Sequence, residues 1–314
     1  AAFVGNLGIT ATSGPGIALK SEALGLAIIA ELPLVVINVQ RGGPSTGLPT
    51  KTEQSDLLQA MYGRNGEAPM PVIASATPGD CFFVAYEACR IAVKYMTPVM
   101  LLNDGYLANG SEPWQVPQLD DLKDFDVTFA DESNLIDGQF MPYTRDKKTL
   151  ARPWAIPGTE GLEHRIGGIE KEDLTGNVSY DPDNHHYMVA TRAKKIEAIA
   201  NEFDPLEIFG NASGDLLILS WGGTKGSCRS AVEKLQADGQ KVSHVHLRWV
   251  NPFPNDLGEI LIKFKNVLIP EINYGQLIKM IRSEFLIDAK GLNQVRGKPI
   301  SSSDIQKAAK DLIG

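Results

Sequence analysis

The stretch LVVINVQ at residues 34–40 decides the fold class. Seven residues without a charge, four of them β-branched, are typical of a strand that is covered on both faces. Residues 72–76 and 99–103 (VMLLN) repeat this pattern, and residues 80–95 between them have apolar side chains at helical spacing. A helix between buried strands predicts an α/β fold with a parallel sheet and helices on both faces.

The same rhythm begins before this stretch. Residues 7–12 predict a short strand, the Ser-Gly-Pro-Gly run at 13–16 a turn, and residues 17–32 a helix that ends at Pro33. Asp80 precedes an apolar helical pattern, so we expect it to be the N-cap of the helix over 80–95.

The chain changes character at about residue 105. Periodicity is lost up to a helix that we expect over residues 187–203, and a loop-rich stretch of this length usually has a function or packs on a partner. The α/β rhythm then returns, with strands expected at 216–221, 242–250 and 266–270 and helices at 222–236, 256–263 and 276–285. We therefore expect two Rossmann-like domains, residues 1–205 with a loop-rich extension from about 105, and residues 206–314.

Composition excludes several classes of protein. The chain has 314 residues, of which 30 are basic and 38 acidic, and a net charge of −8 disfavours nucleic-acid binding. No stretch approaches the ~18 uninterrupted apolar residues of a membrane span, and no signal peptide is visible. The three cysteines, Cys81, Cys89 and Cys228, form no C-x-x-C pair, so we interpret them as small buried hydrophobes of a cytoplasmic protein. Three thiols cannot by themselves hold an iron–sulfur cluster or a four-thiolate zinc ion.

Two loops leave the carboxyl ends of predicted strands, where open parallel sheets bind ligands. Thr12, Ser13 and Gly14 open the first loop, and the helix N-terminus behind them favours an anion or a polar ring. The loop lacks the lysine and the third glycine of the known phosphate loops, so a purely structural turn is an equal alternative.

The second loop, residues 41–50 (RGGPSTGLPT), follows the buried strand directly. Arg41 would lie at the strand end, where its guanidinium suits a carboxylate or a phosphate. Ser45, Thr46 and Thr50 add uncharged hydroxyls. The alternative is a surface arginine before a rigid Pro/Gly turn.

Two further patterns resemble sites but are rejected. Asn103-Asp104-Gly105 has part of the motif by which thiamine enzymes hold diphosphate and metal, yet only Asn134 follows at a suitable distance. We expect Asp104 to cap a turn instead. His185 and His186 are adjacent and point in different directions, so no metal site is predicted.

Several of these residues together resemble a known family. The run 12–16 (TSGPG) with Glu22, residues 39–50 (VQRGGPSTGLPT), 161–164 (GLEH), 181–192 and 270–277 (PEINYGQL) are similar to the α subunit of 2-oxoacid:ferredoxin oxidoreductases, most closely the 2-oxoglutarate branch. The resemblance covers nearly the whole chain, and residues 41–50 are its most specific part.

The resemblance implies a thiamine pyrimidine-binding domain followed by a transketolase C-terminal-like domain. It implies oxidative decarboxylation of a 2-oxoacid with CoA, and electron transfer to ferredoxin. Thiamine diphosphate would bind through Mg²⁺ to a β subunit that also carries a [4Fe–4S] cluster, in a heterodimer or a dimer of heterodimers. Thr12, Ser13 and Gly14 would contact the cofactor, Arg41 with Ser45 and Thr46 the substrate, and Thr50 would influence substrate choice.

The family's activating glutamate is expected about ten residues before Ala1, so no catalytic residue is expected within this chain, and its first domain would be truncated. Two alternatives stay open. The substrate could be pyruvate or a branched-chain 2-oxoacid, or the chain could be a non-catalytic scaffold that binds a nucleotide or CoA.

Overall fold

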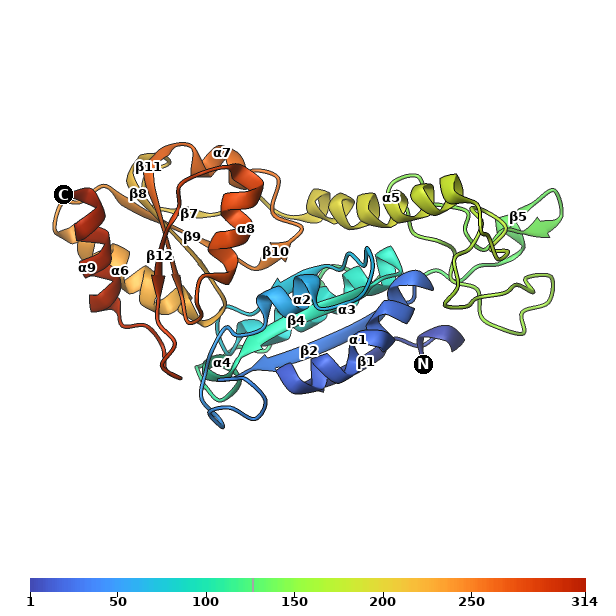
Figure 1. Cartoon of the computed structure of the whole chain (residues 1–314), viewed down its shortest axis with the longest axis horizontal. Helices are drawn as coiled ribbons and strands as arrows, with labels where there is room; N and C mark the ends of the chain where they lie inside the picture. Colours follow the sequence, from blue (N-terminus) through green and yellow to red (C-terminus); the bar gives the residue numbers. More distant parts are fainter. Residues whose placement is uncertain (126) are drawn as a thin grey trace.

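The computed structural model describes residues 1–125 and 127–314. Two five-stranded sheets lie side by side, each flanked by helices, and a long segment of mostly irregular chain extends away from the second sheet before α5 leads back to it (Figure 1). This arrangement confirms the predicted α/β class with two Rossmann-like sheets. None of the helices in the two described ranges is long and apolar enough to cross a membrane.

The first sheet is built around the stretch LVVINVQ. Its strand order is β1 (Gly8–Thr12), β2 (Leu34–Gln40), β4 (Pro98–Asp104), β3 (Val72–Ala74) and β10 (Trp249–Asn251). Val35 packs toward α3 (Asp80–Tyr95), and Val36 packs toward α1 (Gly14–Ile29) and α2 (Leu57–Tyr62) on the opposite face. Both valines are fully buried, as the uncharged run predicts.

The expectation for Asp80 is wrong. Gly79 is the N-cap of α3, and Asp80 is the first helical residue. Its carboxylate accepts a hydrogen bond from the Ala76 backbone N–H at 2.9 Å and pairs with Arg248 from the second half of the chain. The Asp80 side chain therefore connects the segment before α3 to Arg248. It does not accept a hydrogen bond from the backbone N–H groups of the first turn of α3.

The second sheet has the order β12 (Lys290–Asn293), β11 (Phe264–Glu271), β8 (Gly214–Trp221), β9 (Val242–Leu247) and β7 (Ile208–Phe209). It is flanked by η5 (Gly222–Thr224), α6 (Lys225–Ala237), α7 (Leu257–Leu261), α8 (Gln276–Phe285) and α9 (Ser302–Ile313). The sequence analysis did not find β7, β12 or α9.

The single strand expected over 242–250 is in fact two strands that belong to different sheets. β9 pairs with β8 in parallel, whereas β10 crosses to the first sheet and pairs with β3 in antiparallel orientation. β7 is likewise antiparallel to its neighbour β9. Each sheet is therefore parallel with one antiparallel edge strand, and the chain after residue 206 contributes to both sheets.

Residues 105–205 contain short elements and one long helix. The elements are α4 (Gly105–Ala108), η2 (Leu119–Asp121), η3 (Glu132–Asn134), β5 (Leu135–Ile136), β6 (Gln139–Phe140), α5 (Pro182–Ala198) and η4 (Ile199–Glu202), and η1 (Ala2–Val4) lies at the chain start. α5 begins five residues earlier than expected because Asp181 caps it, accepting a hydrogen bond from the Asn184 backbone N–H at 2.7 Å.

A buried ionic cluster ties this segment to the first sheet. Glu31 is 1% exposed, and its Oε2 accepts from Lys195 Nζ and from an Arg145 side-chain nitrogen, each at 2.5 Å. Arg152 and Lys171 are also buried, and the Tyr143 ring has Arg145, Arg152 and Lys171 within 5.7 Å of its centroid. The Glu31 carboxylate therefore lies among four buried cations and forms ion pairs with two of them, Lys195 and Arg145.

The two sheets are joined by a polar contact centred on Gln54, which is fully buried. Its Nε2 donates to the carbonyl oxygen of Trp221 at 2.7 Å, and its Oε1 accepts from the backbone N–H of Ile272 at 3.0 Å. Asn273 donates its side-chain amide to the Gln54 carbonyl at 2.9 Å. This contact holds the chain that follows the 41–50 loop against the carboxyl ends of β8 and β11.

Candidate functional site

The 41–50 loop leaves the carboxyl end of β2 and folds back on itself. The Leu48 backbone N–H donates to the Gly42 carbonyl, and the Gly42 N–H donates to the Lys51 carbonyl, both at 2.9 Å. Gly47 has φ +45°, and a Cβ added there would lie 2.0 Å from the Gly42 carbonyl oxygen. Only glycine fits that position.

Arg41 lies where the sequence placed it, at the end of a buried strand. The side chain is half-buried, its Nε is shielded from solvent without a hydrogen-bond partner, and within the described ranges it forms no ion pair. Its backbone carbonyl is fixed by the Ser55 hydroxyl at 3.0 Å. A guanidinium held in this way is available to a carboxylate or phosphate.

The three hydroxyl residues of the loop are exposed. No hydrogen bond between described residues joins Ser45, Thr46 or Thr50 to Arg41, and all three side chains face solvent. Ser45 has φ +56° and Thr50 has φ +58°. Positive φ is uncommon for any residue with a side chain and is strained for the β-branched Thr50, and such strain is found at functional loops.

The other predicted loop lies at the start of α1. Thr12 ends β1, Ser13 is the N-cap without a side-chain capping bond, and Gly14 opens the helix. A Cβ added at Gly14 would lie 2.9 Å from a carboxylate oxygen of Asp56. The carboxylate of Asp56, six residues after the second loop, therefore lies against the first loop.

Three polar residues of this region were missed by the sequence analysis. Asn38, fully buried within β2, donates its side-chain amide to Asp56 Oδ2 at 3.1 Å, and its Oδ1 has no partner among the described residues. Burial raises the pKa of Asp56, although hydrogen bonds from Ser55 and Asn38 oppose the rise. Burial and the nearby Asp56 also raise the pKa of Glu53. The sequence did contain one signal for this region, because Asn38 is a polar residue within an otherwise apolar strand.

The remaining sequence expectations have mixed outcomes. Asp104 is the N-cap of α4, which confirms its capping role; its carboxylate also accepts from Thr52 at 2.9 Å and from the Gly223 backbone N–H at 2.6 Å. His185 pairs through Nδ1 with Glu170 at 2.5 Å. All three cysteines are free; Cys228 is fully buried as expected, but the other two are only half-buried.

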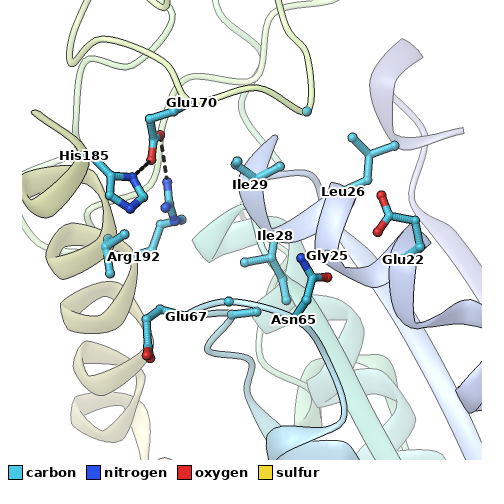
Figure 2. Close-up of a pocket in the computed structure, with 14 residues that line it drawn as sticks. Glu22, Gly25, Leu26, Ile28, Ile29, Asn65, Glu67, Glu170, His185 and Arg192 are labelled. Atoms are coloured by element: carbon cyan, nitrogen blue, oxygen red, sulfur yellow. Dashed lines mark hydrogen bonds and ion pairs between the residues drawn. The ribbon is translucent and has the colours of Figure 1, made fainter. Parts of the chain in front are cut away.

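A cleft of about 260 Å³ lies between α1, α5 and the segments 65–68 and 168–170. Figure 2 shows Glu170 bonded to His185 and Arg192 on one side, facing Ile28, Ile29 and Asn65 on the other. Its lining includes none of the predicted site residues, so the candidate site remains the edge of the first sheet formed by the two loops.

The fold and these loops define a class of protein. Residues 1–180 match the family of pyruvate flavodoxin/ferredoxin oxidoreductases in its thiamine diphosphate-binding domain, and residues 214–305 match the pyruvate:ferredoxin oxidoreductase core domain II. The chain belongs to this family. Among curated proteins it is 52% identical over 307 residues to 2-oxoglutarate oxidoreductase subunit KorA of Mycobacterium tuberculosis, covering 97% of this chain and 46% of that protein.

Two further relatives agree with this. The 2-oxoglutarate synthase subunit KorA of Archaeoglobus fulgidus is 30% identical over 93% of this chain and 76% of its own length. A solved 2-oxoglutarate:ferredoxin oxidoreductase from Magnetococcus marinus, with 2-oxoglutarate, coenzyme A and succinyl-CoA bound, superposes with a TM-score of 0.92 at 34% identity, covering 100% of this chain and 54% of that one. The chain thus spans about half the length of two of these relatives. A split-gene transketolase at 13% identity and TM-score 0.52 shares the fold alone.

Proposed function

We propose that this chain is part of the α subunit of a 2-oxoglutarate:ferredoxin oxidoreductase, which oxidatively decarboxylates a 2-oxoacid with CoA and passes electrons to ferredoxin. The relatives from M. tuberculosis and A. fulgidus carry 2-oxoglutarate in their names, and the M. marinus structure holds 2-oxoglutarate. Pyruvate or a branched-chain 2-oxoacid is the alternative substrate. A non-catalytic scaffold is disfavoured, because it has no use for the strained loop at 41–50.

The observation that carries the proposal is the guanidinium of Arg41, which forms no ion pair with any residue that the structure describes and whose Nε has no hydrogen-bond partner among them. Every 2-oxoacid has a carboxylate beside the reacting carbonyl, and removing that charge from water is costly unless a fixed cation receives it. Arg41 would hold the carboxylate through its planar fork, and Ser45 and Thr46 would add hydroxyl contacts. Thr50, nine residues further along the same loop, would contact the rest of the substrate.

The residues present fit one side of a thiamine site. Ser13 has a hydroxyl that does not cap α1, and with Thr12 and Gly14 it would face the pyrimidine ring of thiamine diphosphate. The one diphosphate-like sequence does not fit the other side, because the Asp104 carboxylate already accepts hydrogen bonds from Thr52 and Gly223. When bound, thiamine diphosphate supplies the carbanion chemistry of decarboxylation.

We therefore assign the diphosphate, its Mg²⁺ and a [4Fe–4S] cluster to a partner β subunit, in a cytoplasmic heterodimer or dimer of heterodimers. We also retain residues 1–205 and 206–314 as the two domains, with β10 reaching from the second domain into the sheet of the first. The split site is tested by calorimetry of the isolated chain with thiamine diphosphate. No saturable binding is expected at high micromolar cofactor, and tight binding by the chain alone would contradict the split.

Arg41→Ala tests the substrate site in the assembled enzyme. Losing a hydrogen-bonded charge partner costs roughly 2–5 kcal/mol, so kcat/KM should fall by about one to three orders of magnitude. Arg41→Lys should recover only part of the loss, because a lysine cannot form the bidentate contact. The matched control is Lys51→Ala, which removes an exposed cation ten residues away. Near-wild-type kinetics for Arg41→Ala would remove this residue from the site.

A further inference from the structure

Residues 270–277 (PEINYGQL) form a rigid turn between the end of β11 and the start of α8. Glu271 is fully buried, and its carboxylate accepts hydrogen bonds from two backbone N–H groups in the first turn of α8, at 2.8 and 3.2 Å. The Asn273 Oδ1 accepts from the backbone N–H groups of Gly275 and Gln276, at 2.7 and 3.0 Å. These bonds satisfy N–H groups that the start of a helix leaves unpaired, so the backbone of Gln276 is fixed.

The Gln276 side chain reaches across to the first domain. Its Nε2 donates to the carbonyl oxygen of Ser55 at 2.8 Å, and its Oε1 accepts from the backbone N–H of Leu58 at 2.9 Å. Leu58 lies in the first turn of α2, and Ser55 immediately precedes the N-cap residue Asp56. One amide therefore holds the start of α2 as a donor and as an acceptor at once, and both bonds together fix its orientation.

Ser55 carries this contact to the start of the 41–50 loop. Its hydroxyl donates to the carbonyl oxygen of Arg41 at 3.0 Å, and no other hydrogen bond from a described side chain reaches the backbone of Arg41. β2 ends at Gln40, so Ser55 holds the residue at which the chain leaves the sheet. Gln276, Ser55 and Arg41 thus form a continuous path from the second domain to the candidate substrate site.

We propose that Gln276 is a positioning residue for substrate binding, which acts through Ser55 to hold Arg41 where its guanidinium receives the carboxylate of the 2-oxoacid. The inference rests on the proposed function, because it requires that Arg41 binds the substrate. A bidentate contact between a guanidinium and a carboxylate needs one mutual orientation. If the start of the loop shifts, this orientation is populated for only part of the time, and the apparent affinity falls by that fraction.

Steady-state kinetics of the assembled enzyme, with the 2-oxoacid varied at saturating CoA and ferredoxin, test the proposal. Gln276→Leu removes both hydrogen bonds at similar volume. If the binding conformation is then populated about one tenth of the time, KM for the 2-oxoacid rises about tenfold. The value of kcat should stay within about threefold of wild type, because the change affects binding and not the chemical step.

Two further variants break the path at single bonds. Gln276→Glu still accepts from the Leu58 N–H but has no donor for the Ser55 carbonyl, so KM should rise here too. Ser55→Ala removes the bond to Arg41 and leaves the bonds of Gln276 intact, since these reach only backbone atoms. It should raise KM in the same direction, whereas a merely structural role of Gln276 predicts no effect of Ser55→Ala on KM.

A double-mutant cycle separates positioning from general damage. In an Arg41→Ala background, Gln276→Leu should change KM by less than about twofold, because the side chain that it positions is gone. The matched control is Lys279→Gln, an exposed residue one turn further along α8, which should leave KM unchanged. Melting temperatures and subunit content of the purified enzymes show whether the variants fold and assemble. Where Gln276→Leu fails to assemble, Gln276→Glu and Ser55→Ala decide the question in the same cycle.

The outcomes for the positioning role and for the proposed function are distinct. A KM that rises equally with and without Arg41, or a loss that lies entirely in kcat, would overturn the positioning role of Gln276 while Arg41 remains the substrate residue. An unchanged KM for Arg41→Ala, or a wild-type enzyme that turns over no 2-oxoacid, would overturn the proposed function and this inference with it.

Discussion

Glu31→Gln should destabilise the protein far more than its single-atom change suggests. Glu31 is the carboxylate that bonds to both Lys195 and Arg145 in the buried cluster, with Arg152 and Lys171 close by. An amide leaves these cations without their counter-charge in a region closed to water. Removing one partner of a buried pair costs roughly 3–5 kcal/mol, and we expect a loss of that size at pH 7.

The pH dependence of stability tests the same ion pairs. The pKa of Glu31 is lowered from 4.5 to about 2, because Lys195 and Arg145 outweigh the effect of burial. A carboxyl whose pKa is depressed in the folded state contributes stability above pH 4.5 and loses it as the pH falls toward 2. The stabilisation that Glu31 provides through its lowered pKa is therefore present at pH 7 and lost in acid.

The assay is urea unfolding followed by far-ultraviolet circular dichroism, for wild type and Glu31→Gln between pH 7 and pH 2.5. The difference between the two free energies of unfolding should shrink as the pH falls below 4.5. Lys195→Met should cost less, because burial and neighbouring cations already lower the pKa of Lys195 to about 8. The double variant should cost less than the sum of the singles by roughly 1–3 kcal/mol. A loss below about 1 kcal/mol for Glu31→Gln, or a difference independent of pH, would refute the reasoning.

Two other predictions concern the join between the sheets and the substrate loop. Gln54→Leu should lower the free energy of unfolding by roughly 2–4 kcal/mol, because it leaves the Ile272 N–H buried without a partner and removes one of the two donors to the Trp221 carbonyl, which keeps the Thr224 hydroxyl; a change under about 1 kcal/mol in urea unfolding would contradict this. Thr50→Ala should shift the ratio of kcat/KM between 2-oxoglutarate and pyruvate by roughly 1–3 kcal/mol, whereas an equal fall on both substrates would argue against a role in specificity.

Part of the candidate site could be predicted from the sequence. Arg41 directly follows an uncharged run, and the end of a buried parallel strand is a place where ligands bind, so its position needed only local information. Asn38, Glu53 and Asp56 were missed because their role in the site depends on tertiary contacts, which the sequence does not show. In the sequence, Asn38 is simply a polar residue two positions before the end of a strand. Only the folded chain places its side chain against Asp56.

The sequence by itself determined the fold class and the core of the first sheet, because the alternation of uncharged strands and amphipathic helices is a local pattern. β2, α3 and α8 occupy the ranges that this pattern predicted. Tertiary structure alone decided that β9 and β10, which form one continuous strand pattern, enter different sheets, since periodicity says nothing about a strand's partner. It also decided that Glu31 pairs with Lys195, which is 164 positions away in the sequence. A buried charge needs an opposite charge beside it, and the packing of the folded chain determines which residue supplies that charge.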